Sequence, residues 1–321
     1  MKKRTVIVSS VMLGLSLMQL YSLRQASEAM TLNSFDLQVG KSKIHVNVEG
    51  RLNISQRQLQ SYIEDASRAV IKYYGRLPLA QTVINVTATP GDTVGFATAT
   101  YDDDAECGVI DINIGRNVDS QSLDTSWTLT HEMLHLAFPV VHHNRRWLAE
   151  GIATYAEPIG RLRTGKLSAE EVWSDLVDNC PSGLPAQGAP GLNKNGSWGS
   201  TYWGGALFCL LADVEIRKQT NNRLGLEHAL RAITDSGGSA ASDWTAEQAI
   251  ATGDRALGLQ VLQSLYARMA LRPGYVDLPT LWRELGVKRV GGSVVLVDNA
   301  PLSHIRRAIE SNGASKPANG S

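Results

Sequence analysis

Apolar and polar residues alternate in three segments of the first part of the chain. The segments are residues 44–48, 83–87 and 109–114. A period of two places successive side chains on opposite faces of a strand, so we expect three half-buried strands here. Pro90-Gly91-Asp92 has the composition of a turn that follows the second of them.

A helix is expected between the first two strands. Apolar residues from Leu59 to Tyr73 recur at helical spacing, Ser55 is suited to cap the start, and Gly75 is suited to end it. Residues 30–120 are therefore expected to form an N-terminal α/β lobe with a mixed sheet.

Beyond about residue 122 the apolar residues follow a helical period. Helices are expected near residues 125–138, 146–157, 168–177, 200–218, 224–234, 256–269 and 301–310. Thr125 or Asp124 is suited to cap the first of these helices. The chain is thus expected to have an α+β fold, with helices over 121–310 and a disordered tail at 311–321.

The N-terminus has the features of an export signal. Lys2, Lys3 and Arg4 precede the uncharged segment 5–23, and the small residues around 27–29 suit a signal peptidase. Residues 1–29 are therefore expected to be a signal peptide, and the protein to be periplasmic or secreted. The alternative is a retained membrane anchor, because the uncharged segment approaches the roughly 20 residues that span a bilayer.

Charge and cysteine content narrow the classes of partner and site. Lys plus Arg and Asp plus Glu each total 31 in 321 residues, so no net charge favours nucleic acid as a partner. The cysteines, Cys107, Cys180 and Cys209, are too widely spaced for a zinc ribbon. Cys209 stands in an apolar run and is expected to be buried, which leaves Cys107 and Cys180 as the candidate disulfide pair.

The candidate chemistry is in His131-Glu132-Met133-Leu134-His135. Residues four apart lie on the same face of a helix, so both imidazoles can reach one cation with Glu132 beside it. Three protein ligands and one open position are typical of catalytic zinc, which lowers the pKa of a bound water to about 7. We therefore expect a Zn²⁺ site in which Glu132 acts as general base.

A third ligand is expected from the next helix. The metzincin pattern, which continues with Gly and a third His, is absent, because Phe138 and Val141 stand at those positions. The next helix contains two carboxylates two turns apart on one face, Glu150 and Glu157. By spacing, either could complete the site.

The catalytic region resembles the gluzincin zinc metallopeptidases. The segment from Trp147 to Ala153 is similar to the one that carries the third zinc ligand in the zinc aminopeptidase family. That resemblance implies Glu150 as the ligand, with Glu157 as the alternative. It covers about residues 125–218 and implies a zincin-like fold, in which the sheet packs on the active-site helix.

A second segment of the same region carries the resemblance further. Tyr202-Trp203-Gly204-Gly205 resembles the helix start that supplies a transition-state tyrosine in gluzincins, and the helix that follows is similar to that of the glycyl-aminopeptidase-like families. The resemblance therefore implies that Tyr202 stabilises the oxyanion of the transition state.

Two departures from the zinc aminopeptidases bear on specificity. The interval between His135 and Glu150 is shorter than in that family, and the Gly-x-Met-Glu-Asn strand that binds a substrate's amino group has no counterpart before His131. The segment 95–99 is a candidate for a substrate-side edge strand, but it contains no carboxylate.

Together these patterns predict an exported zinc metallopeptidase that acts on peptide or protein substrates. Two other functions stay open. One is an aminopeptidase that recognises the amine by other residues, and the other is a zincin-like protein that binds envelope partners without hydrolysis. A membrane would be a partner only if the N-terminal segment were retained.

Overall fold

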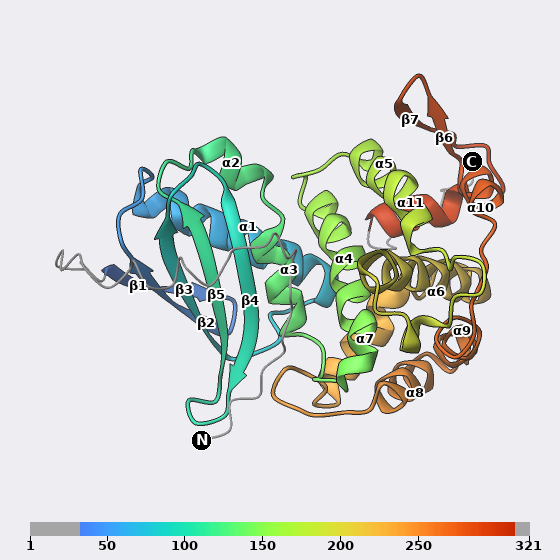
Figure 1. The fold of residues 1–321 in the computed structure, drawn as a ribbon, viewed down its shortest axis with the longest axis horizontal. Coiled ribbons are helices and arrows are strands. Elements are labelled where there is room, and N and C mark those ends of the chain that lie inside the picture. Colours follow the sequence, from blue (N-terminus) through green and yellow to red (C-terminus); the bar gives the residue numbers. More distant parts are fainter. Residues whose placement is uncertain (1–32, 312–321) are drawn as a thin grey trace, which may run out of the picture.

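A computed structural model describes residues 33–311 of the chain. They form a sheet on one side of the molecule and a larger group of helices on the other (Figure 1). The predicted α+β fold, an N-terminal mixed sheet followed by a helical part, is confirmed. The predicted signal peptide, residues 1–29, lies outside the described residues, as does most of the predicted tail.

The sheet has five strands in the order β1-β2-β3-β5-β4. They are β1 (Asn33–Val39), β2 (Ser42–Glu49), β3 (Gln81–Thr89), β4 (Val94–Asp102) and β5 (Cys107–Gly115). The three central strands, β2, β3 and β5, are parallel to one another and contain the three predicted segments, whereas the edge strands β1 and β4 run antiparallel to their neighbours. The segment 95–99 therefore lies on an edge strand, as the sequence predicts.

Helix α1 (Gln56–Tyr74) connects β2 to β3 and lies against one face of the sheet (Figure 1). Its predicted ends are confirmed: Ser55 and Gln58 form a reciprocal capping box, and Gly75 closes the helix at φ 85°. The buried side chains of α1 join a core that includes Ile84 and Ile110 of the central strands. This core fixes the position of α1 relative to the sheet.

The segment predicted as one helix over 125–138 is two helices, α2 (Ser120–Thr125) and α3 (Thr128–His135). The predicted cap is wrong, because Asp119 caps α2 and α3 has no side-chain cap. Ser126 breaks the helix with an extended backbone, and its hydroxyl shares a hydrogen bond of 3.1 Å with the Tyr62 hydroxyl on α1. The His-Glu-x-x-His motif consequently occupies the last turns of α3.

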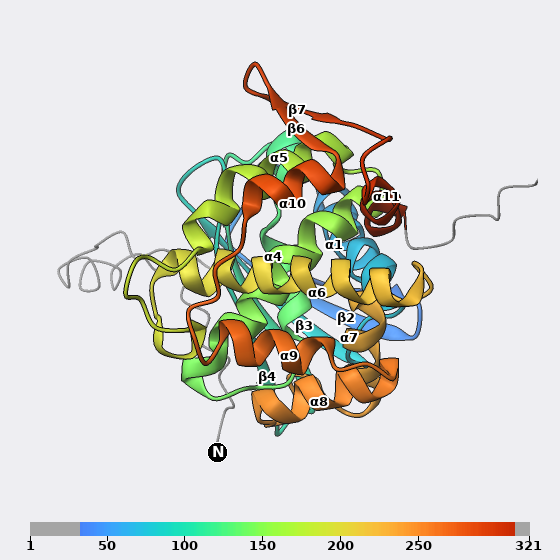
Figure 2. The same cartoon turned by 90° about the vertical axis from the view of Figure 1, so that its right-hand side faces the viewer.

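The helical part is arranged around α4 (Arg146–Arg163), which contacts α1 and α3 on one side and α6 (Gly205–Thr220) on the other. Figure 2 shows α6 in front of α4, with the remaining helices around the pair. These are α5 (Ala169–Asn179), α7 (Leu226–Asp235), α8 (Ala246–Leu257), α9 (Val261–Met269), α10 (Leu278–Leu285) and α11 (Ser303–Ser311). A π-helical turn (Ser200–Gly204) leads directly into α6.

Some boundaries in the helical part differ from prediction. The helix expected over 256–269 is the end of α8 and all of α9, because Gly258 ends α8 in the left-handed conformation and the Asp254 carboxylate caps α9. Ser311 ends α11, although it was predicted to begin the tail. Most of α8 (residues 246–255), helix α10 and a hairpin of β6 (Val287–Val290) and β7 (Ser293–Leu296) were not predicted.

The predicted disulfide is wrong, because Cys107, Cys180 and Cys209 are all free and buried. Cys107 begins β5 in the sheet, whereas Cys180 follows α5 in the helical part. Burial raises the pKa of the Cys180 thiol to about 12. The burial of Cys209 is confirmed, at 1% exposure.

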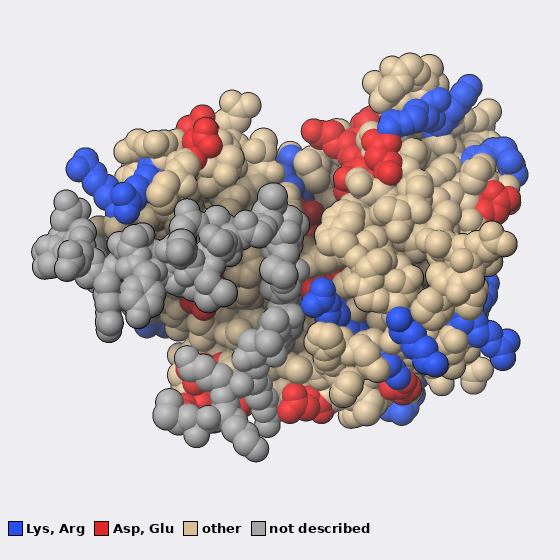
Figure 3. Space-filling model, in the orientation of Figure 1, with Lys and Arg blue, Asp and Glu red and all other residues tan. Residues whose placement is uncertain are grey.

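The surface shown in Figure 3 carries basic and acidic side chains in small groups separated by uncharged surface. None of the helices within residues 33–311 has both the length and the apolar character needed to cross a bilayer.

Candidate metal centre

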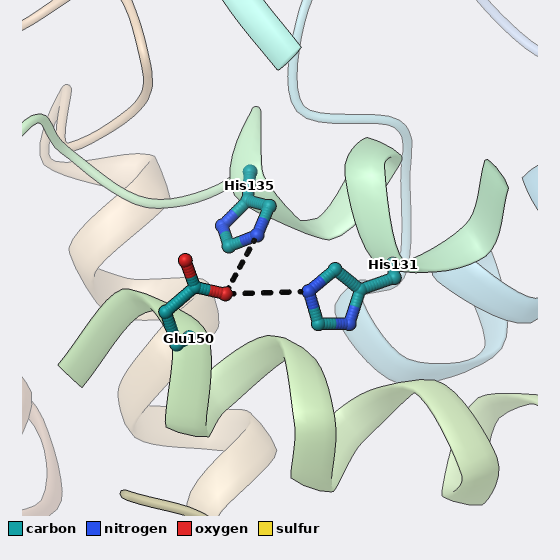
Figure 4. Close-up of side chains that lie close together, drawn as sticks. All are labelled: His131, His135 and Glu150. Carbon is teal, nitrogen blue, oxygen red and sulfur yellow. Dashed lines mark ion pairs between the residues drawn. The ribbon is translucent and has the colours of Figure 1, made fainter. Parts of the chain in front are cut away.

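Three buried side chains from two helices converge between the sheet and the helical part (Figure 4). His131 and His135 lie one turn apart on α3, and Glu150 lies near the start of α4. The Oε2 atom of Glu150 is 3.4 Å from Nε2 of His131 and 3.5 Å from Nε2 of His135. Within residues 33–311 this is the one group of three side chains whose donor atoms could hold a metal ion together.

The three groups influence each other's protonation. Burial lowers the pKa of His131. Burial acts in the same direction on His135, but attraction to the Glu150 carboxylate outweighs it and raises the pKa. Burial would raise the pKa of Glu150, yet the two imidazoles hold it at about 2. The site therefore favours a carboxylate anion together with a positive charge close to it.

The arrangement fits zinc. Bonds of about 2.0–2.2 Å to ligands at tetrahedral corners place the ligand atoms about 3.3–3.5 Å apart, which matches the two measured distances. Nε2 of His135 and Oε2 of Glu150 are buried without a hydrogen-bond partner among the described residues. Unpaired buried polar atoms are costly, and coordination of a cation would satisfy both.

Glu132 lies next to this group and is held by the edge strand of the sheet. Its carboxylate accepts a hydrogen bond from the backbone N–H of Ala99 on β4, while its Oε2 atom is buried and has no hydrogen-bond partner within residues 33–311. Burial raises the pKa of Glu132 to about 7, although His135 and the Ala99 N–H act in the opposite direction. A carboxyl group that titrates near neutral pH suits general acid–base chemistry.

Tyr202 reaches the same place from the π-helical turn before α6. Its ring is 8% exposed and stacks on the His131 ring, with 6.5 Å between centroids and 29° between planes. The sequence contained the Tyr-x-x-Gly segment, but only the structure shows that it lies beside the His pair.

Glu157 does not join the group. Its Oε1 atom accepts a hydrogen bond of 3.0 Å from Nη1 of Arg161, one turn further along α4. Arg161 in turn donates to the backbone oxygen of Thr125 at the end of α2. Glu157 thus pairs with the arginine that connects α4 to α2, and Glu150 is the carboxylate beside the imidazoles.

The start of α4 is fixed by a hydrogen-bond chain that was not apparent in the sequence. Trp147 donates from its indole N–H to Oδ1 of Asn193 at 2.9 Å, and the Asn193 amide donates to the Tyr266 hydroxyl at 3.0 Å. The Tyr266 hydroxyl donates to Glu247 at 2.7 Å. Because Trp147 lies one turn before Glu150, this chain holds the carboxylate in place.

No protein-family profile matches the sequence, and no curated protein matches it. Solved structures do match. An aminopeptidase N family protein from Idiomarina loihiensis superposes with a TM-score of 0.60 at 14% identity, over 80% of this chain and 49% of that chain. The similarity lies in the fold.

Two further solved structures have the same fold. A variant of a two-domain M1 zinc metallopeptidase bound to L-arginine has a TM-score of 0.51 at 15% identity, over 77% of this chain and 54% of that chain. An M1 zinc metallopeptidase from Deinococcus radiodurans has a TM-score of 0.50 at 15% identity, with the same coverage, 77% and 54%. The chain spans about half the length of these proteins.

Proposed function

We propose that this chain is an exported zinc-dependent metallopeptidase of gluzincin type. The observation that carries the proposal is the convergence of His131, His135 and Glu150 at ligand-to-ligand distances that suit zinc, with Glu132 directly beside them. The fold shared with zinc metallopeptidases supports it. Export rests on the N-terminal sequence, whose basic start and apolar segment are typical of a signal.

In this proposal the three converging residues hold the ion, and Glu132 moves the proton. A zinc ion held there would polarise a peptide carbonyl and would activate water for attack on it. Glu132 accepts the proton from the attacking water and passes it to the leaving amine. Its burial and the Ala99 N–H keep one carboxylate oxygen oriented and leave the other free to take the proton.

Tyr202 is proposed to stabilise the oxyanion that forms as water attacks. Its ring stacks on His131, so it is held against one side of the centre. A preorganised hydroxyl donor costs no reorganisation during the reaction, which is why removal of one such donor reduces turnover by about 10²–10³.

The test is hydrolysis of a mixed peptide pool by the purified protein, with zinc and with a chelator, alongside the Glu132→Gln variant. Mass spectrometry reads the cleavage positions. Zinc-dependent cleavage that is lost in the variant supports the peptidase. A folded, zinc-loaded protein that cleaves nothing in the pool would favour the alternative of a non-catalytic envelope binding protein.

A second candidate is an aminopeptidase, since one structure with this fold is of an aminopeptidase N family protein. The segment 95–99 on β4 carries no carboxylate to bind a free amine, so other residues would have to do so. Sequential loss of residues from the N-termini of unblocked peptides, with blocked peptides left intact, would support this candidate over internal cleavage.

A further inference from the structure

Two half-exposed tryptophans flank the metal centre. Trp127 directly precedes α3, and Trp198 lies just before the π-helical turn that contains Tyr202. Their exposed fractions are 49% and 53%. Four other tryptophans in residues 33–311 are at most 9% exposed, namely Trp147, Trp173, Trp203 and Trp282. Trp244 is partly buried, so Trp127 and Trp198 are the two exposed tryptophans of residues 33–311.

Both tryptophans are in ring contact with residues of the centre. Trp127 meets His131 edge to face, with 5.2 Å between ring centroids. Trp198 packs on Tyr202 with 5.7 Å between centroids, and Tyr202 stacks on His131. The four rings are thus contiguous: the inner two, His131 and Tyr202, are buried, and the outer two are open to solvent.

A third exposed aromatic side chain belongs to the strand that contacts Glu132. Phe96 is 47% exposed and lies on β4, where the register shifts between Val94 and Ala97. Such a bulge re-aims side chains at a sheet edge, often next to a site. Three of the segments around the centre therefore carry a large exposed aromatic residue, whereas α4, which supplies Glu150, carries none.

We propose that Trp127 and Trp198 form a recognition site for a bulky apolar side chain of the peptide, next to the bond that is cleaved. The inference rests on the proposed peptidase function for the identity of the ligand. An indole that is half exposed leaves apolar surface in contact with water. A bound apolar side chain would bury that surface, which is favourable. Trp127 contacts the His131 ring directly and Trp198 reaches it through the Tyr202 ring, so an apolar side chain bound on these indoles belongs to a residue adjacent to the scissile bond.

Binding to a hydrolytically inactive protein tests the inference without relying on turnover. Zinc-loaded Glu132→Gln protein is titrated calorimetrically with a blocked peptide that has one central Phe and with the same peptide carrying Ala. The Phe peptide is expected to bind about tenfold more tightly or better, within the range for an apolar pocket. In the Trp127→Ala and Trp198→Ala backgrounds this ratio is expected to fall to about twofold.

Controls separate recognition from damage to the centre. Trp127 touches His131, so zinc content is measured in each variant, and Trp127→Phe, which keeps an aromatic ring, is expected to retain most of the preference. Tyr275→Ala removes another exposed aromatic ring, 67% exposed, from the connection between α9 and α10, and is expected to leave the ratio unchanged.

Two results would overturn the inference even if cleavage is zinc-dependent. One is equal binding of the Phe and Ala peptides, and the other is a preference for the Phe peptide that persists in both Trp127→Ala and Trp198→Ala. Conversely, a tryptophan-dependent preference in a protein whose native form cleaves nothing would support the recognition site while the peptidase proposal fails.

Discussion

Gly151 of α4 and Gly205 of α6 lie backbone against backbone. A Cβ on Gly151 would be 2.2 Å from the carbonyl carbon of Gly205, and one on Gly205 would be 2.2 Å from the carbonyl oxygen of Trp147. Gly151 directly follows Glu150, and Gly205 comes three residues after Tyr202. The contact between the glycines therefore brings the segment of Tyr202 close to the helix that carries Glu150.

Gly151→Ala is expected to destabilise the protein by about 1–3 kcal/mol or more, because the new Cβ would meet backbone atoms of Gly205, which cannot rotate away. Denaturant unfolding measures the loss. Gly196→Ala is the matched control, since a Cβ there would meet nothing within 4 Å. Equal stability of the two variants would contradict the close approach of the helices.

Glu150→Gln is expected to lose zinc, whereas Glu157→Gln is expected to keep it, because Glu157 is occupied by Arg161. Removing a residue that only hydrogen-bonds to a metal ligand typically lowers metal affinity by roughly 10–100-fold. The loss of zinc affinity in Glu150→Gln should exceed this, because Glu150 is proposed to be a ligand itself. Zinc affinity is measured by competition with a chromophoric chelator. Full zinc binding by Glu150→Gln would show that the carboxylate is not a ligand.

Tyr202→Phe is expected to lower kcat by about 10²–10³ without changing zinc content, because it removes one hydroxyl donor and keeps the stacked ring. Turnover of a peptide identified in the pool and metal analysis of the same sample are the two readouts. A variant that loses its zinc would instead assign Tyr202 a structural role.

Zinc removal is expected to lower the thermal midpoint of unfolding. A metal bound at about 100 times its dissociation constant stabilises the native state by about 2.7 kcal/mol. Because both imidazoles must be neutral to bind metal, this stabilisation should decline as the pH falls, first through the raised pKa of His135 and then through the lowered pKa of His131. His131→Ala should remove the difference between zinc and chelator at every pH.

The three thiols are expected to react with iodoacetamide only when the protein unfolds, with or without a reductant present. All three cysteines are free and buried, and burial raises the pKa of Cys180 to about 12, so little reactive thiolate forms. Mass spectrometry of native and denatured samples counts the labels. A species with two fewer free thiols that recovers them on reduction would restore the disulfide that the sequence suggested.

Local patterns determined much of this protein. The alternation in 44–48, 83–87 and 109–114 predicts the three central strands, because one face of each is buried. Ser55 and Gly75 mark the ends of α1, because their side-chain and backbone preferences act within one turn. The four-residue spacing of His131 and His135 places both on one face of their helix, and this does not depend on what the helix packs against.

The tertiary structure decided which distant groups meet these residues. Glu150 and Glu157 share a face of α4 but lie about 10 Å apart along its axis, so both cannot reach one cation, and the crossing of α3 over α4 selects Glu150. Three other features likewise depend on contacts between separate segments. They are the helix break at Ser126, the hydrogen bond from the Ala99 N–H to Glu132, and the ring contacts of the two tryptophans at the centre. Sequence periodicity and capping residues reflect interactions within one helix turn or one strand. The contacts between separate segments arise instead from the packing of whole helices and strands against one another.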